Sequence, residues 1–293
     1  MENKMSTKLN WVRFLCAVII VTDHSFDYIR YGEINKGVVE NLIYFFTQMS
    51  TKGLTWIAMA LFFTISGYLM FHNWNNKIDT ITWYKSKLKS RIRTLLVPYL
   101  CWNSIWTVFY IVAGKILTDT NIDTSYTISN IADGVLYGKF NEIFWYIQVL
   151  MIFAVISPMI GMCVERLKIA WVMIAAIISF AVMMLLVSGP FVMMRNYYCF
   201  FFYSLGAYLT MNRQEIVTTR VSEKSKALLL SELVLSIFVI QLTKTPDNIF
   251  SPVQGGIMLV ATFFGIICAW LIADPPGIIT KSNWGGGCAP AHL

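Results

Sequence analysis

The chain has 293 residues, of which 57% are hydrophobic, 15% aromatic and only 13% charged. A soluble domain usually carries about 25% charged and about 45–50% apolar residues, so this chain has too little charge to cover a surface that faces water. The composition excludes a disordered chain, a collagen-like repeat and a secreted disulfide scaffold, and it predicts a protein embedded in lipid.

Eight segments are predicted to cross the membrane as helices, because a bilayer core of ~30 Å needs roughly 20 apolar residues. The expected fold class is therefore all-α, a polytopic bundle of about eight spans over residues 9–273. The first span is the most polar, since it contains Arg13, Asp23 and His24, and the seventh contains Glu232. The predicted spans are 9–28, 54–71, 95–113, 144–162, 169–187, 197–211, 227–243 and 249–273.

Two other segments are expected not to cross by themselves. Residues 38–49 place apolar side chains at helical spacing opposite Glu40 and Asn41. This pattern favours a helix lying in the interface, or the first half of a longer second span. Residues 274–293 contain no apolar run, so a disordered or aberrant tail is expected there.

The lysines and arginines predict the orientation of the bundle. With the N-terminus inside, the inner side receives 16 of the 23 basic residues, and every inner loop is basic. Cytoplasmic loops carry such an excess, so both termini are predicted to be cytoplasmic. The formal net charge of +7 is thereby explained by topology, and no nucleic-acid partner is inferred.

The sequence predicts no metal site and no cleaved leader. The six cysteines are scattered and lack the paired spacing of zinc or haem ligands, so they are expected to behave as small buried hydrophobes. The first apolar run is interrupted by Arg13 and is followed by no small-residue cleavage site. It is therefore expected to be retained as a helix.

Arg13 and His24 are the leading functional candidates, because ionisable residues inside a membrane helix are costly. They are eleven positions apart, which places them on one face of the helix, about 16 Å apart along its axis. Arg13 is either a functional group or a cytoplasmic anchor, and His24 either a buried general base or a polar helix end. Asp23 points about 100° away from His24 and is a weaker candidate.

Five motifs, in order along the first six predicted spans, resemble those of the acyltransferase-3 family of integral membrane acyltransferases. The resemblance covers about residues 9–211 and continues loosely to residue 273. The motifs are Arg13 and His24 with ten residues between them, Phe62-Phe63-Thr-Ile-Ser66-Gly67-Tyr68, Lys89-Ser-Arg91-Ile-Arg93 with Pro98-Tyr99, Phe144-Trp145-Tyr146 ending at Pro158, and Arg195-Asn196 with Phe201-Phe202 and Gly206.

The resemblance implies transfer of an acyl group, often acetyl, from cytoplasmic acyl-coenzyme A to a hydroxyl of a sugar or of a glycan, free or lipid-linked, in the cell envelope. Acyl-coenzyme A would be a co-substrate rather than a bound cofactor, and a bacterial plasma (inner) membrane the expected location. Arg13 and His24 match the family's essential pair. The substrate-binding candidates are Arg91, Arg93, Arg195, Trp145 and Glu142.

Several of these residues have a simpler interpretation beside the functional one. The basic cluster from Lys85 to Arg93 suits the phosphates of coenzyme A, but Lys85 and Lys87 are better explained as cytoplasmic anchors. Glu142 faces the acceptor or caps a helix. Gly67, with Ser66, is expected to allow close helix packing rather than to form a nucleophile site.

The chain departs from the family pattern at its C-terminal end. Members of the family generally continue with further spans and an aromatic-Leu-Leu-His-like close, whereas this sequence predicts a truncated or frameshifted end. Two alternatives therefore stay open, a secondary transporter and a catalytically inactive membrane partner. Against the transporter, no sequence repeat and no matched pair of interrupted spans are found.

Overall fold

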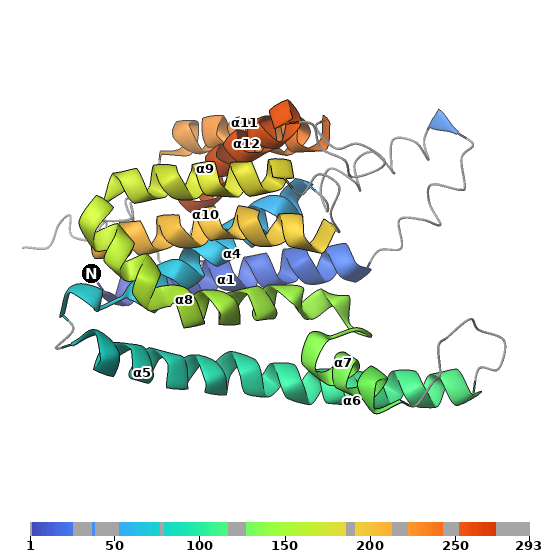
Figure 1. The fold of residues 1–293 in the computed structure, drawn as a ribbon. Helices are drawn as coiled ribbons and strands as arrows, with labels where there is room; N and C mark the ends of the chain where they lie inside the picture. Colours follow the sequence, from blue (N-terminus) through green and yellow to red (C-terminus); the bar gives the residue numbers. More distant parts are fainter. Residues whose placement is uncertain are drawn as a thin grey trace, which may run out of the picture.

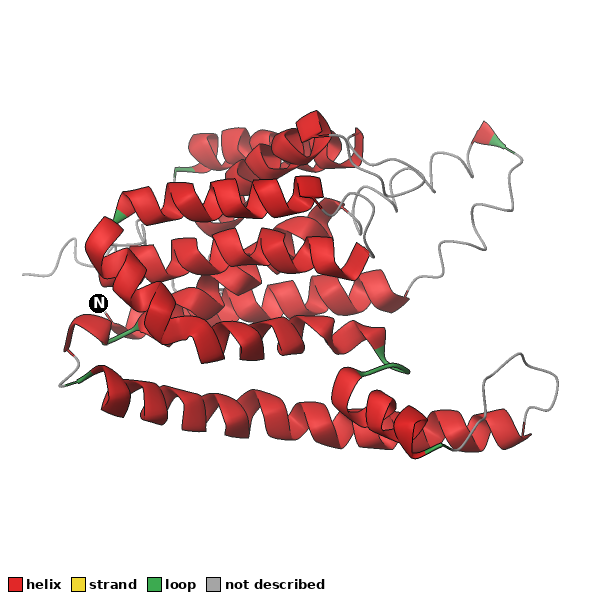
Figure 2. Ribbon diagram, viewed as in Figure 1, coloured by secondary structure: helices red, strands yellow, loops and turns green. Residues whose placement is uncertain are grey.

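The computed structural model describes residues 2–25, 37–38, 53–76, 79–116, 127–185, 191–212, 222–242 and 252–273. In these ranges all regular structure is helical (Figure 2), which confirms the predicted all-α fold class. The expected interfacial helix at 38–49, apart from its first residue, and the expected tail at 274–293 lie outside the described residues.

Each of the eight predicted spans corresponds to a helix, and most bounds agree within a few residues. The long helices are α1 (Glu2–Ser25), α4 (Leu54–Phe71), α6 (Val97–Ile116), α8 (Trp145–Leu167), α9 (Ile169–Leu185), α10 (Phe191–Met211), α11 (Glu223–Leu242) and α12 (Pro252–Ile272). Figure 1 shows them as one roughly parallel bundle, with α4 and α10 in its interior and α11 and α12 on one side.

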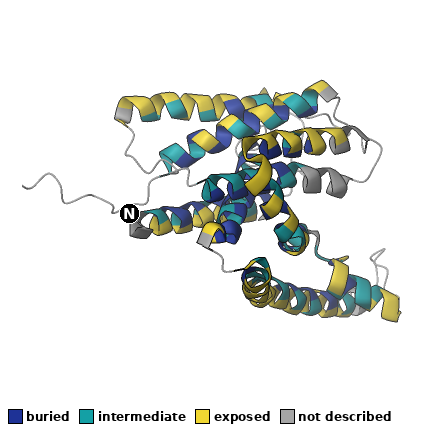
Figure 3. Cartoon of the chain, turned by 60° about the vertical axis from the view of Figure 1, so that its left-hand side comes forward, coloured by how far each residue is buried: buried dark blue, intermediate teal, exposed yellow. Residues whose placement is uncertain are grey.

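Five segments of the described chain are long and apolar enough to cross a membrane. They are Met5–His24, Leu54–Phe71, Thr80–Ala113, Trp145–Leu167 and Val253–Ile272. Buried side chains concentrate where the helices meet, and many large apolar side chains face outward (Figure 3). Such a surface suits lipid. The number of spans and the side of each terminus stay predictions.

Helices α4 and α10 form the centre of the bundle through two glycines. A Cβ on Gly67 would overlap the carbonyl oxygen of Tyr203, and a Cβ on Gly206 would overlap that of Thr64. The two backbones therefore approach as closely as small residues permit in membrane helices. Gly67 and Gly206 belong to two motifs and are 139 residues apart in the sequence, yet the helices that carry them pack directly against each other. The structure therefore agrees with the prediction that Gly67 allows close helix packing.

The helix that contains the third predicted span begins well before the apolar run from which that span was predicted. Helix α5 (Thr80–Arg91) continues through the π-helical segment η3 (Ile92–Leu96) into α6, so the basic cluster lies on the helix itself. Pro98 has no N–H to donate one turn back, and the Val97 N–H bonds to the Ile92 carbonyl five residues earlier. The prediction began at residue 95 because the preceding residues are polar.

Asp79 starts α5 as its N-cap, and its carboxylate accepts the backbone N–H of Thr82 at 2.7 Å. The hydrogen bonds from Thr82 hold the pKa of Asp79 below its ordinary value. Because the folded pKa is depressed, the cap stabilises the helix above the unfolded pKa of about 3.9 and is lost as pH falls through the folded value.

We expect Asp79→Ala to speed hydrogen exchange in the first turn of α5 at neutral pH, because the cap accepts an otherwise unpaired N–H. Asp79→Asn serves as the control, since it keeps the capping oxygen and removes the acid sensitivity. Hydrogen exchange measured by mass spectrometry at pH 7 and pH 3.5 checks this result. Equal exchange in Asp79→Ala and the unmodified chain at pH 7 would contradict it.

Helix α7 (Ile128–Tyr137) lies between the third and fourth predicted spans, where no helix was predicted. Thr127 caps its start, accepting the N–H of Asn130, and Gly138 ends it with a left-handed φ of 65°. These two residues are typical helix boundary signals. The helix was not predicted because it is too short to cross the membrane.

Candidate functional site

Arg13 of α1, Arg91 of α5 and Tyr203 of α10 are here called the cationic site. The half-buried Arg91 lies within electrostatic range of Arg13, of the buried Tyr203 and of Lys87 on its own helix. Two guanidinium groups repel each other unless an anion lies between them. Arginine is also well suited to bind phosphate, because its planar guanidinium can donate two parallel hydrogen bonds to the phosphate oxygens.

The other basic residues of the cluster are placed differently. Lys87 is half-buried, and its Nζ donates to the Leu69 carbonyl at the end of α4 at 3.2 Å. It therefore supports the junction between α4 and α5. Arg93 is exposed and lies two residues beyond Arg91, on roughly the opposite side of the helix. Arg91 is thus within electrostatic range of Arg13, whereas Arg93 faces away from Arg91.

An aromatic cluster holds the cationic site in place. Phe71 contacts Trp74, Trp83 and Tyr203, with ring centroids 5.6, 5.6 and 6.2 Å away. Trp74 donates its indole N–H to Glu165 of α8 at 3.1 Å. Tyr203 is packed between the rings of Phe71 of α4 and Phe153 of α8, whose centroids are 6.2 and 5.0 Å from its own.

His24 lies in the last turn of α1, and both it and Arg13 are on the exposed side of that helix. Eleven residues separate them, about 16 Å along the axis. The two cannot share one small ligand. A ligand that contacts both residues would have to extend along α1. Asp23 is buried, so the structure places it on the other side of α1 from His24.

The remaining predicted residues lie on other helices. Trp145 begins α8, is half-buried, and its ring lies 6.4 Å from that of Phe63 in α4. Glu142 begins the short helix η4 (Glu142–Phe144), and Arg195 lies in the first two turns of α10, but the side chains of both are outside the described part. No contact between these residues and the cationic site is described.

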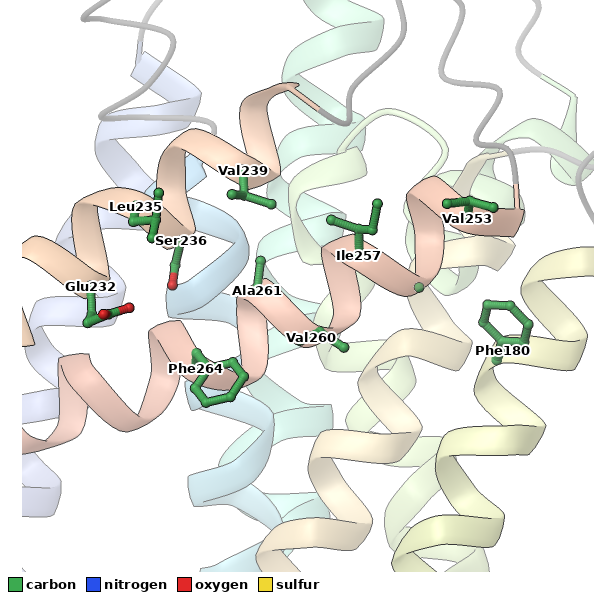
Figure 4. Close-up of a pocket in the computed structure, with 11 residues that line it drawn as sticks. Phe180, Glu232, Leu235, Ser236, Val239, Val253, Ile257, Val260, Ala261 and Phe264 are labelled. Atoms are coloured by element: carbon green, nitrogen blue, oxygen red, sulfur yellow. The ribbon is translucent and has the colours of Figure 1, made fainter.

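A groove of about 600 Å³ lies between α9, α11 and α12 (Figure 4). Phe180, Val253, Ile257, Val260, Ala261 and Phe264 form much of its apolar lining. Its polar side chains are Glu232 and Ser236, one turn apart on α11. None of the residues predicted for catalysis or substrate binding lines it.

In the ranges that the structure describes, no group of three or more His, Cys, Asp or Glu residues could hold a metal ion. The site also contains a residue that the sequence analysis did not identify. Tyr203 follows Phe201-Phe202, which was recognised as a motif, but nothing in the sequence shows that it lies within electrostatic range of Arg91. Only the crossing of α10 with α4 brings it there.

Comparison with protein families gives one match that spans nearly the whole chain. The family model described as an acyltransferase domain, the acyltransferase-3 type, matches residues 6–285. Comparisons with curated proteins and with solved structures found no match.

Proposed function

This chain belongs to the acyltransferase-3 family of membrane proteins, and we propose that it transfers an acetyl group from cytoplasmic acetyl-coenzyme A to a hydroxyl of an envelope glycan. The observation that carries the proposal is that Arg13, near the middle of α1, lies within electrostatic range of Arg91, whereas His24 lies in the last turn of α1. A phosphate-bearing donor with a long flexible arm fits this separation, and a small inorganic anion does not.

In the proposed reaction, His24 is the catalytic residue. Its imidazole accepts the proton of the acceptor hydroxyl, whose oxygen attacks the thioester carbonyl of the donor. The carbon–sulfur bond then breaks, the acetyl group remains on the acceptor oxygen as an ester, and the coenzyme A thiolate takes the proton back from the imidazolium. Trp145 is proposed to contact the sugar acceptor, and Glu142 and Arg195 to lie near it.

The proposed location is the plasma (inner) membrane, with the basic loops and both termini on the cytoplasmic side. In this orientation the cationic site faces the compartment that holds coenzyme A thioesters, and His24 lies deeper in the membrane or toward the far face. One helix would thus connect the donor with an acceptor on the other side.

The test is radiolabelled acetyl transfer from acetyl-coenzyme A to isolated envelope glycan, comparing membranes with and without the chain. We expect the label in the glycan only when the chain is present. Solute uptake without labelling would favour the transporter instead, and neither labelling nor uptake would favour an inactive membrane partner.

Arg91→Ala is expected to raise the KM for acetyl-coenzyme A roughly 10- to 100-fold, because a hydrogen bond to a charged group contributes about 1.5–3 kcal/mol. Arg91→Lys should recover part of the loss, since lysine keeps the charge without the planar fork. Steady-state kinetics with varied donor at fixed acceptor measures both.

Two neighbouring variants serve as comparisons for Arg91→Ala. Lys85 is exposed on the same helix, and Lys85→Ala should leave the donor KM within about twofold. Arg93→Ala should have a smaller effect than Arg91→Ala, because Arg93 lies away from Arg13. Equal effects at positions 85 and 91 would show that general surface charge, rather than the Arg13–Arg91 site, binds the donor.

A further inference from the structure

Three polar side chains hold the end of α7 from two membrane helices. The Tyr99 hydroxyl donates to the Leu136 carbonyl at 3.0 Å, and Asn103 Nδ2 donates to the Val135 carbonyl at 3.5 Å. Gln148 Nε2, from α8, donates to the Tyr137 carbonyl at 2.9 Å and also to the Tyr99 hydroxyl. Three successive carbonyls at the C-terminal end of α7 are thus satisfied by three side chains, here named the α7 clamp.

The clamp explains why these polar groups lie in predicted spans. Asn103 is fully buried in α6, and Tyr99 is only 4% exposed. The last carbonyls of a helix have no partner within it, and an unsatisfied carbonyl at membrane depth is costly. Tyr99 and Asn103 are four residues apart, so they form one stripe of α6 that faces the end of α7.

The same stripe extends to the turn that follows α7. Asn141 Nδ2 donates to Asn103 Oδ1 at 3.2 Å, and the Asn141 backbone N–H donates to the Gly138 carbonyl at 2.8 Å. Thr107 lies one further turn along α6. A Cβ added to Gly134 of α7 would be 2.5 Å from the Thr107 Oγ1 atom, so there is no room for a larger residue at position 134. Helix α7 therefore lies directly against α6 (Figure 1), and its turn is tied down as well.

We propose that Tyr99, Asn103 and Gln148 are positioning residues, which hold α7 and the turn 138–144 so that Trp145 presents a fixed surface to the acceptor. Trp145 follows that turn directly, and Gln148 lies three residues beyond it on the same helix. The assignment of Trp145 to the acceptor rests on the proposed function. The clamp itself rests on the hydrogen bonds alone.

The experiment uses the full chain in lipid vesicles with two clamp variants and one control. Asn103→Leu removes two of the hydrogen bonds, and Tyr99→Phe removes a single hydroxyl while keeping the ring, so it remains informative if Asn103→Leu folds poorly. Ser104→Ala is the control, because the Ser104 hydroxyl donates to Leu100 within α6 and does not contact α7.

Hydrogen exchange over residues 128–141 is expected to rise roughly 10- to 100-fold in Asn103→Leu and roughly fivefold in Tyr99→Phe, and to stay unchanged in Ser104→Ala. In both clamp variants the KM for isolated envelope glycan should rise at least fivefold, with the KM for acetyl-coenzyme A within twofold of the unmodified chain. This combination of results would support the proposal.

Unchanged exchange in both clamp variants would overturn the clamp. Faster exchange with an unchanged glycan KM, or an equal rise of both KM values, would overturn the positioning role. If the unmodified chain labels no glycan, the proposed function fails instead, and the exchange comparison still decides separately whether the clamp holds α7.

Discussion

Gly206→Ala is expected to lower the midpoint of thermal unfolding by roughly 5–10 °C. The added Cβ would overlap the Thr64 carbonyl oxygen and come within 2.8 Å of the Tyr68 nitrogen, and both are backbone atoms of α4. Backbone atoms cannot rotate away as a side chain can, so the helices must separate. Overpacking of this kind typically costs about 1–3 kcal/mol, and in a chain of this size each kcal/mol shifts the midpoint by roughly 2–4 °C.

The control for this prediction is Gly256→Ala in α12. There the nearest atom to an added Cβ is a ring carbon of Phe180 at 3.5 Å, an ordinary contact, so the midpoint should not fall. Light-scattering melts of the purified chain in one detergent compare the two variants. Equal midpoints for Gly206→Ala and Gly256→Ala would show that α4 and α10 do not cross at these glycines.

His24→Ala is expected to reduce the rate of acetyl transfer about 10²- to 10⁴-fold, the usual contribution of a general base. The effect should fall on kcat, with the KM for acetyl-coenzyme A almost unchanged, because the proposed donor site includes Arg13, about 16 Å away along α1. Added imidazole should restore part of the rate, since position 24 is exposed.

The matched control is His72→Ala, which removes the exposed histidine that ends α4. Its transfer rate should stay within about twofold of the unmodified chain when both proteins reach the membrane in equal amounts. A full rate in His24→Ala would exclude this residue as the base and would leave the acceptor hydroxyl to be activated by another group.

The spans were predictable because a helix surrounded by lipid must be composed mostly of apolar residues. A helix such as α4 must be apolar over about 18 residues to lie in lipid, and its predicted and observed bounds coincide at Leu54 and Phe71. Helix α7 was not predicted because a helix of ten residues needs no long apolar run. Its capping residues Thr127 and Gly138 were the available signal.

The candidate site was predictable only in part. Arg13 and His24 are detected because charge is rare in this chain, and their spacing on one helix fixes their separation. The meeting of Arg91 with Arg13 and Tyr203 depends on how α1, α5 and α10 pack, and no local pattern encodes that. The α7 clamp was missed for the same reason, since its hydrogen bonds join side chains of α6 and α8 to the backbone of α7.

The most direct test of the central claim uses the purified chain in sealed vesicles of known orientation, with radiolabelled acetyl-coenzyme A on one side only and envelope glycan on both sides. Labelled glycan is expected when the donor is on the side of the basic loops, the side of Arg91. Equal or greater labelling with the donor on the opposite side, or no labelling from either side, would contradict the account.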